Sequence, residues 1–118
     1  MRPHQNLDLW KKSIELAVSI YRHTEKFPKE ERFSLTQQLR RAAVSIASNI
    51  AEGAARASTK EFRKFLMYSQ GSASEVSTQL MIARRMNYLE LSDFEKLDQD
   101  LDDIGRMITG LSRNLKRR

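Results

Sequence analysis

Apolar residues recur at intervals of three and four along nearly the whole chain. The longest such run lies near the C-terminus and consists of Phe94, Leu97, Leu101, Ile104, Ile108, Leu111 and Leu115. This spacing places the side chains on one face of an α-helix, whereas a half-buried strand would alternate every second residue. No stretch of the chain alternates in that way. The pattern therefore predicts an all-α protein with helices at about residues 7–26, 34–55, 59–86 and 93–114.

Local signals mark where these helices begin and end. Pro28 ends the first helix, because the residue before a proline avoids the α region. Ser34 is a candidate N-cap of the second helix, and Asn87 is expected to end the third. Ser58 and Ser92 each begin a Ser-x-x-Glu capping-box pattern at the start of the third and fourth helices. Four helices joined by short turns predict one domain that spans the whole chain and folds as an antiparallel up-and-down four-helix bundle.

The first helix carries two apolar rows. One contains Leu9, Leu16 and Ile20, and the other contains Leu7, Trp10, Ile14, Ala17, Val18 and Tyr21. Two apolar rows need either two neighbours in the same chain or one neighbour and a subunit interface. After the first turn, Phe33 is expected to enter the core. Gly71, in the middle of the third helix, predicts a close helix contact, because Gly costs roughly 1 kcal/mol there relative to Ala.

Composition adds a bias toward anionic partners. The chain has 118 residues, with 21 Lys and Arg against 15 Asp and Glu, and a net charge of +6. This balance favours nucleic acid as a partner, although many small basic proteins bind nothing anionic. The absence of cysteine excludes disulfides and thiolate metal sites. No apolar run approaches the roughly 20 residues of a membrane span and no leader peptide is evident, so we expect a cytoplasmic protein.

Small polar residues line one flank of the second helix. Ser45, Asn49 and Glu52 repeat at helical spacing where a solvated face would normally carry Lys and Glu. With the facing residues of the third helix, the predicted polar seam consists of Arg41, Ser45, Asn49, Glu52, Ser72 and Glu75. Arg41 and Glu75 are placed to form an ion pair. The seam is either a binding or acid–base site or, the interpretation that we favour, a hydrogen-bonded network that sets the helix register.

No catalytic or metal-binding pattern stands out. His4 and His23 are the only histidines, and His23 has no carboxylate three or four residues away. No His-Glu-x-x-His or Glu-x-x-His pair suggests a metal, and no glycine-rich loop follows a strand to cradle phosphate. Glu52 and Glu75 are single carboxylates. We therefore expect a protein that is not an enzyme and that has no cofactor.

Basic residues cluster at the turn between the second and third helices and in the C-terminal tail. Because the predicted bundle reverses direction at each turn, that turn and the tail share one end with Lys11 and Lys12. Phosphates bind where Lys and Arg cluster. The candidate nucleic-acid-binding residues are Arg40, Arg41, Arg56, Lys60, Arg63, Lys64, Arg113, Lys116 and Arg117. The alternative is ordinary solvation, since cations near the end of a helix also complement its dipole.

Three runs of this sequence resemble a known family. They are Leu39–Gly53 (LRRAAVSIASNIAEG), Ser58–Leu66 (STKEFRKFL) and Gly71–Leu80 (GSASEVSTQL). Together they resemble the bacterial four-helix-bundle proteins encoded in 23S rRNA intervening sequences, also called S23-type proteins. The resemblance implies an up-and-down bundle that assembles into a homopentamer and has no assigned enzymatic activity. Related proteins serve as accessory factors of diversity-generating retroelements, where they work with a reverse transcriptase and contact nucleic acid.

Residues and resemblance together predict a non-catalytic, pentameric bundle that binds RNA or DNA through basic surfaces. The alternative is a protein-interaction scaffold, or an accessory factor for a reverse transcriptase or another nucleic-acid enzyme. The positions that carry the resemblance are expected to be structural, whereas the partner is expected at Arg56–Lys64.

Overall fold

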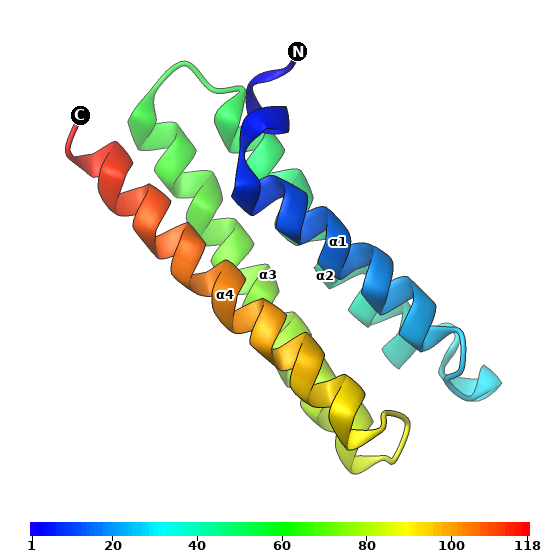
Figure 1. Ribbon diagram of the computed structural model, residues 1–118. Coiled ribbons are helices and arrows are strands. Elements are labelled where there is room, and N and C mark those ends of the chain that lie inside the picture. The colour runs from blue at the N-terminus through cyan, green and yellow to red at the C-terminus, as the bar shows by residue number, and fades with distance from the viewer.

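The computed structural model describes residues 1–118, which form four α-helices and no strands. The elements in chain order are η1 (Pro3–Asn6), α1 (Asp8–Thr24), η2 (Lys29–Glu31), α2 (Leu35–Ala54), α3 (Thr59–Arg85) and α4 (Leu91–Lys116), where η denotes a 3₁₀-helix. The molecule measures 46 × 22 × 22 Å. Both termini and the α2–α3 connection lie at one end, and the other two connections lie at the opposite end (Figure 1). The predicted all-α fold with four helices is confirmed.

All four helices begin and end within two residues of their predicted positions, and of the two predicted capping boxes only the one at Ser58 has its serine at the N-cap. Ser58 is the N-cap of α3, and its hydroxyl accepts a hydrogen bond from the Glu61 N–H at 3.1 Å. The prediction of a capping box at Ser92 is wrong. The N-cap of α4 is Glu90, whose backbone is extended, and the helix starts directly after it. Ser92 therefore lies inside the first turn, where its side chain cannot act as the cap.

The start of α2 and the end of α3 lie at the predicted residues, but only at the second does the predicted residue itself close the helix. Ser34 is the N-cap of α2, but its side chain makes no capping hydrogen bond. The first N–H of α2 donates to the Glu31 carboxylate at 3.4 Å instead. Beyond α3, Asn87 adopts a left-handed backbone with φ of 64°. The next N–H, of Tyr88, donates to the carbonyl of Ala83 at 2.9 Å, which closes the helix as a Schellman motif.

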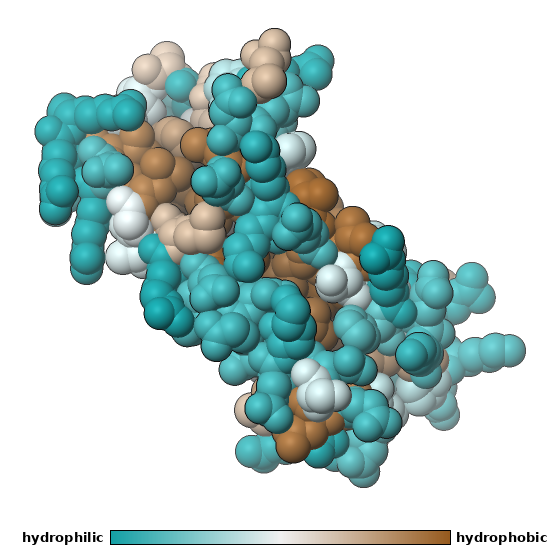
Figure 2. Space-filling model, viewed as in Figure 1, coloured by the Kyte–Doolittle hydropathy of each residue, from teal (hydrophilic) through white to brown (hydrophobic).

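The core consists of aliphatic side chains from all four helices. The largest fully buried ones are Leu16, Ile20, Leu39, Ile46, Ile50, Leu66, Val76, Leu80, Leu97 and Ile104. On α1, only one of the two predicted apolar rows turns fully inward. Ile14, Val18 and Tyr21 of the other row are 38%, 42% and 44% exposed. Apolar atoms accordingly interrupt the hydrophilic surface along α1 (Figure 2).

The aromatic residue that fills the corner before α2 is Phe27, so the placement of Phe33 in the core is wrong. Phe27 is 7% exposed, and its ring centroid lies 5.4 Å from that of Tyr88. Phe33 is 81% exposed. The short helix η2 carries the chain across the end of the bundle, and Phe33 follows it on the outer side of the turn. The Arg32 guanidinium lies 5.6 Å from the centre of its ring.

Helix α2 approaches α3 closely at Gly53. A Cβ at this position would lie 2.8 Å from Phe65 Cβ and 2.9 Å from Phe62 Cδ1, well inside van der Waals contact. The glycine therefore permits the close packing that the small residues of α2 predict. Gly71 does not have this role, because a Cβ there would meet nothing within 4 Å. The expected close contact at Gly71 is wrong.

Candidate nucleic-acid interface

Seven cationic side chains gather at the end of the molecule that holds the α2–α3 connection and the C-terminus. We call this set the basic end: Arg56, Lys60, Arg63, Lys64, Arg113, Lys116 and Arg117. None of them takes part in an ion pair, since every ion pair of the molecule uses Lys12, His23, Lys96 or Arg106 as its basic partner. Most of these side chains are exposed, so their charges remain available to an anion.

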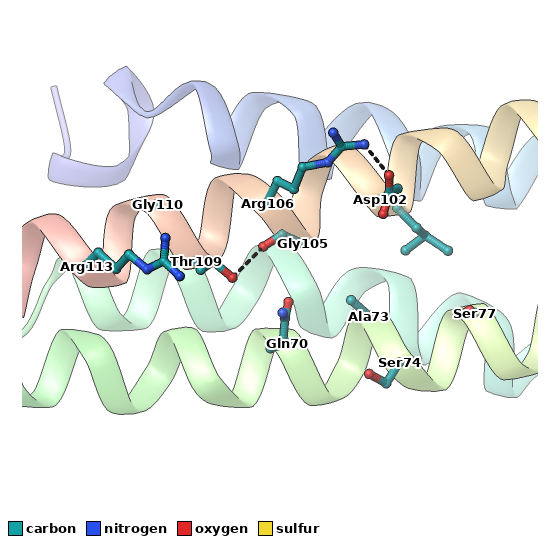
Figure 3. A pocket seen from close by; sticks show the side chains of 11 residues that line it. Gln70, Ala73, Ser74, Ser77, Asp102, Gly105, Arg106, Thr109, Gly110 and Arg113 are labelled. Atoms are coloured by element: carbon teal, nitrogen blue, oxygen red, sulfur yellow. Dashed lines mark hydrogen bonds and ion pairs between the residues drawn. The ribbon is translucent and has the colours of Figure 1, made fainter.

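A groove between α3 and α4 leads toward the basic end. Its main hollow has a volume of about 640 Å³, and small residues of both helices, such as Ser74 and Gly105, keep it open. Figure 3 shows Arg106 bound to Asp102, whereas Gln70 and Arg113 reach into the groove without a partner. The wall nearest the basic end is therefore the cationic part of the groove.

The same groove continues to the start of α3. A second hollow of about 330 Å³ shares Gln70 and Arg113 with the first and adds Arg63 and Lys116. A third, of about 560 Å³, shares Arg63 with the second and adds Lys60 and Lys64. The buried Nε of Arg63 has no hydrogen-bond acceptor within the chain. We call the second and third hollows the basic groove, since five cations and a single carboxylate, Glu61, line them.

Two of the candidate residues lie away from this end. Arg40, in the first half of α2, stacks 4.6 Å from the centre of the Tyr21 ring. Its Nε donates to Thr24 Oγ1 at 2.9 Å, and its Nη2 donates to the Tyr21 carbonyl at 3.2 Å. Arg40 thus ties α2 to α1. Its neighbour Arg41 is exposed on a different face of α2.

The predicted polar seam between α2 and α3 forms at its centre. Ser72 donates to Ser45 Oγ at 3.0 Å, and Asn49 donates to the carbonyl and hydroxyl oxygens of Ser45 at 2.9 and 3.0 Å. Ser69, which is not among the predicted seam residues, is fully buried and donates to the Ile46 carbonyl at 2.8 Å. The bonds of Ser69 and Ser72 join α3 to α2, whereas those of Asn49 stay within α2 and hold the Ser45 side of the seam.

The outer members of the seam remain apart. The expected ion pair between Arg41 and Glu75 does not form. Both instead line a shallow hollow of about 400 Å³ with Gln79, whose buried Oε1 has no hydrogen-bond partner. Glu52 is exposed. Long exposed side chains gain little from pairing, because water screens the attraction and fixing them costs entropy.

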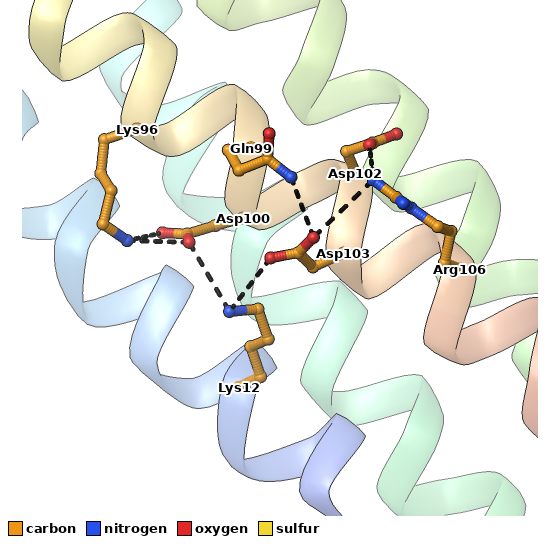
Figure 4. Close-up of polar contacts among 7 residues, drawn as sticks. All are labelled: Lys12, Lys96, Gln99, Asp100, Asp102, Asp103 and Arg106. Carbon is orange, nitrogen blue, oxygen red and sulfur yellow. Dashed lines mark hydrogen bonds and ion pairs between the residues drawn. The ribbon is translucent and has the colours of Figure 1, made fainter.

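Several carboxylates of α4 have cationic partners within the molecule. Lys12 of α1 lies 3.6 Å from Asp100 and 3.7 Å from Asp103, and Lys96 lies 2.8 Å from Asp100 (Figure 4). The hydrogen bond that Lys96 donates to Asp100 raises the pKa of the Lys96 ammonium group. The expectation that Lys12 adds charge to the basic end is therefore wrong, because its ammonium group forms ion pairs with Asp100 and Asp103 of α4.

At the opposite end, Tyr88 donates a hydrogen bond to Glu31 at 2.9 Å, which raises the pKa of the tyrosine hydroxyl.

The two histidines lie far apart in the chain: His4 packs against Trp10, and His23 lies 3.8 Å from Asp93. No three His, Cys, Asp or Glu side chains are grouped so as to hold a metal ion. None of the helices has the length and apolarity to cross a membrane.

Fold and surface together define a four-helix, all-α protein with a cationic groove at one end. The chain belongs to the 23S rRNA-intervening sequence protein family, whose model matches residues 5–110. It shares its fold with a crystal structure from Bacteroides thetaiotaomicron, described as a protein with unknown function from the S23 ribosomal protein family. That comparison has a TM-score of 0.79 and 24% identity, over 88% of this chain and 97% of the other. No curated protein matches the chain.

Proposed function

We propose that this protein is a non-catalytic, cytoplasmic, antiparallel four-helix bundle that binds RNA or DNA through its basic end. The observation that carries the proposal is the set of seven cations without carboxylate partners, five of which line a continuous groove. The ion pairs of the molecule lie elsewhere, between α4 carboxylates and Lys12, His23, Lys96 or Arg106. A polyanion at the basic end relieves the repulsion among these cations and releases counterions.

A salt titration tests this proposal. The affinity for tRNA, for rRNA fragments and for duplex DNA is measured by fluorescence anisotropy from low to physiological salt. Because several phosphates are neutralised, the logarithm of the affinity falls linearly with the logarithm of salt, with a slope of roughly 0.7–0.9 per phosphate contact. If none of these nucleic acids binds even at low salt, the proposal fails.

The bundle also acts as an oligomer in this proposal, and the exposed apolar row of α1 supports an interface there. Ile14 and Val18 lie one helical turn apart, and Val44 of α2 is exposed as well. The resemblance to the S23-type proteins favours five subunits. Light scattering is then expected to give five times the 13.7 kDa of one chain. Val18→Glu is expected to dissociate the ring, whereas Leu91→Glu, an exposed apolar position at the start of α4, leaves the mass unchanged.

The same apolar row favours a second candidate function, an interaction scaffold for a protein such as a reverse transcriptase. In that case the row binds the partner and not another copy of this chain. The mass of the purified protein would be 13.7 kDa, and Val18→Glu would abolish the complex with the partner. A neighbouring reverse transcriptase gene would favour this second function, whereas an rRNA operon would favour the first.

A further inference from the structure

An aromatic and cationic cluster lies beside the basic groove, formed by the first half of α3 and the connection that precedes it. The rings of Phe65 and Tyr68 meet edge to face, with centroids 5.5 Å apart and planes at 83°. The Arg56 guanidinium lies 4.7 Å from the centre of the Phe65 ring, and the Lys64 ammonium lies 6.0 Å from that of Tyr68. We call these four residues the aromatic cluster.

Packing within the chain does not account for Tyr68. Its side chain is 48% exposed and lies outside the hydrophobic core and the layer packed against it. The Tyr68 hydroxyl makes no hydrogen bond. Tyr88 differs in both respects, because its hydroxyl binds Glu31 and its ring packs on the core. A large ring left in water, next to cations without carboxylate partners, is a feature of surfaces that bind single-stranded nucleic acid.

We propose that Tyr68 stacks against an unpaired base while Arg56 and Lys64 contact the phosphates on either side of it. This inference rests on the proposed function and specifies the class of nucleic acid: single strands, or the unpaired segments of a folded RNA. Every base offers a flat face to an aromatic ring, so such stacking tolerates any sequence. In a duplex the base faces are already stacked on each other, so a duplex gains only the phosphate contacts.

The position of Lys64 supports this arrangement. Lys64 contributes both to the aromatic cluster and to the third hollow of the basic groove. Lys64 and Tyr68 are four residues apart on α3 and therefore lie on one face of the helix. A strand whose phosphates follow the basic groove thus passes beside the Tyr68 ring. The sequence carries a signal for this arrangement, since aromatic residues recur every third position at 62, 65 and 68, with Arg63 and Lys64 between the first two.

The test compares single strands and duplexes of about 10 nucleotides, within the range that single-strand binders cover. The probes are oligouridine, oligothymidine, an RNA duplex and a DNA duplex. Tyr68→Leu is expected to weaken binding of both single strands roughly 10-fold and to leave both duplexes unchanged, since one stacked base is lost. A loss for oligouridine alone assigns the site to RNA, and a loss for oligothymidine alone assigns it to DNA. Tyr68→Phe keeps the ring and is expected to bind like the unmodified protein.

Phe33→Leu is the matched control. Phe33 is 81% exposed and also contacts an arginine, Arg32, but it lies at the opposite end of the molecule. It is expected to leave all four affinities unchanged. If the unmodified protein binds single strands and Tyr68→Leu binds them equally well, the inference is wrong while the proposed function stands. If the unmodified protein binds none of the probes at low salt, the proposed function itself fails.

A fluorescence experiment gives an independent readout that does not depend on the leucine variant. Trp10 is the only tryptophan, so Tyr68→Trp in a Trp10→Phe background reports on position 68 alone. Saturating oligouridine is expected to quench this tryptophan by stacking, and unchanged emission overturns the inference. Light scattering of Tyr68→Leu must match the unmodified protein. A smaller mass together with weaker binding would make Tyr68 a subunit contact and also overturn the inference.

Discussion

Ser69 on α3 donates a hydrogen bond of 2.8 Å to the backbone carbonyl of Ile46 on α2. Both residues are fully buried, and 23 positions separate them in the chain. The next bond along the interface joins Ser72 to Ser45. Serine is short enough to let the two backbones approach, and its hydroxyl finds its acceptor on the other helix. The polar seam is thus a structural feature of the α2–α3 contact.

Ser69→Ala is expected to destabilise the protein by about 1 kcal/mol, the net contribution of a typical hydrogen bond in a folded protein. Urea denaturation measures this change, and Ser74→Ala, on the exposed side of α3, is the control. The affinity for nucleic acid is expected to stay the same. A loss of binding without a loss of stability would instead make the seam a binding site.

Gly53→Ala is expected to lower the free energy of unfolding, although alanine is the better helix former. Its Cβ would lie 2.8 Å from Phe65 Cβ, so α2 and α3 would have to move apart. Overpacking of this kind costs about 1–3 kcal/mol. Gly71→Ala is the opposite case, because its Cβ would meet nothing within 4 Å, and a gain of roughly 0.5–1 kcal/mol is expected there. Thermal unfolding of both variants separates the two effects, and a stabilised Gly53→Ala would contradict the close contact.

The triple substitution Lys60→Gln, Arg113→Gln and Lys116→Gln tests the basic groove. All three side chains are exposed, so the fold is expected to remain intact. The slope of the logarithm of affinity against the logarithm of salt concentration is expected to become shallower by about 2–3, because three phosphate contacts disappear. The control is a second triple substitution, Arg22→Gln, Lys26→Gln and Lys29→Gln, which removes the same charge from the opposite end of the molecule. Equal losses in both triple variants would show that net charge, and not the groove, drives binding.

The hydrogen bond between Tyr88 and Glu31 makes stability depend on pH in the alkaline range. It raises the pKa of Tyr88 above its ordinary value of 10.0, so the neutral hydroxyl is favoured in the folded state. This contribution is fully present below pH 10.0 and is lost as pH rises through the higher pKa of the folded protein. Tyr88→Phe is therefore expected to be less stable than the unmodified protein at neutral pH and to approach it above pH 10.0. Tyr68→Phe, which loses a hydroxyl without a partner, should show no such convergence.

Much of the fold could be predicted because its signals are local. The three-and-four spacing of apolar residues defines each helix along its own length. The boundaries are set by residues next to them: Pro28 after the first helix, Ser58 before α3 and Asn87 after it. The family could be recognised for a similar reason. Its motifs lie on the α2–α3 contact, where close packing restricts the choice of residues.

The candidate site was less predictable. The cations of the basic end were found as clusters in the sequence, but the groove that five of them line depends on how α3 packs on α4. Lys12 could be assigned to the basic end from its position near the start of α1. Only the packing of α1 on α4 shows that it pairs with Asp100 and Asp103. The exposure of Tyr68 likewise depends on which face of α3 turns inward.

The sequence by itself determined four helices, their ends and the family, because backbone hydrogen bonding and side-chain period act along the chain. Tertiary structure decided which apolar row of α1 is buried, which phenylalanine enters the corner before α2, and which charges find partners. Helical periodicity defines faces but not their rotation toward neighbours. Long side chains such as Lys12 and Arg41 reach several partners, and the packed helices select among them.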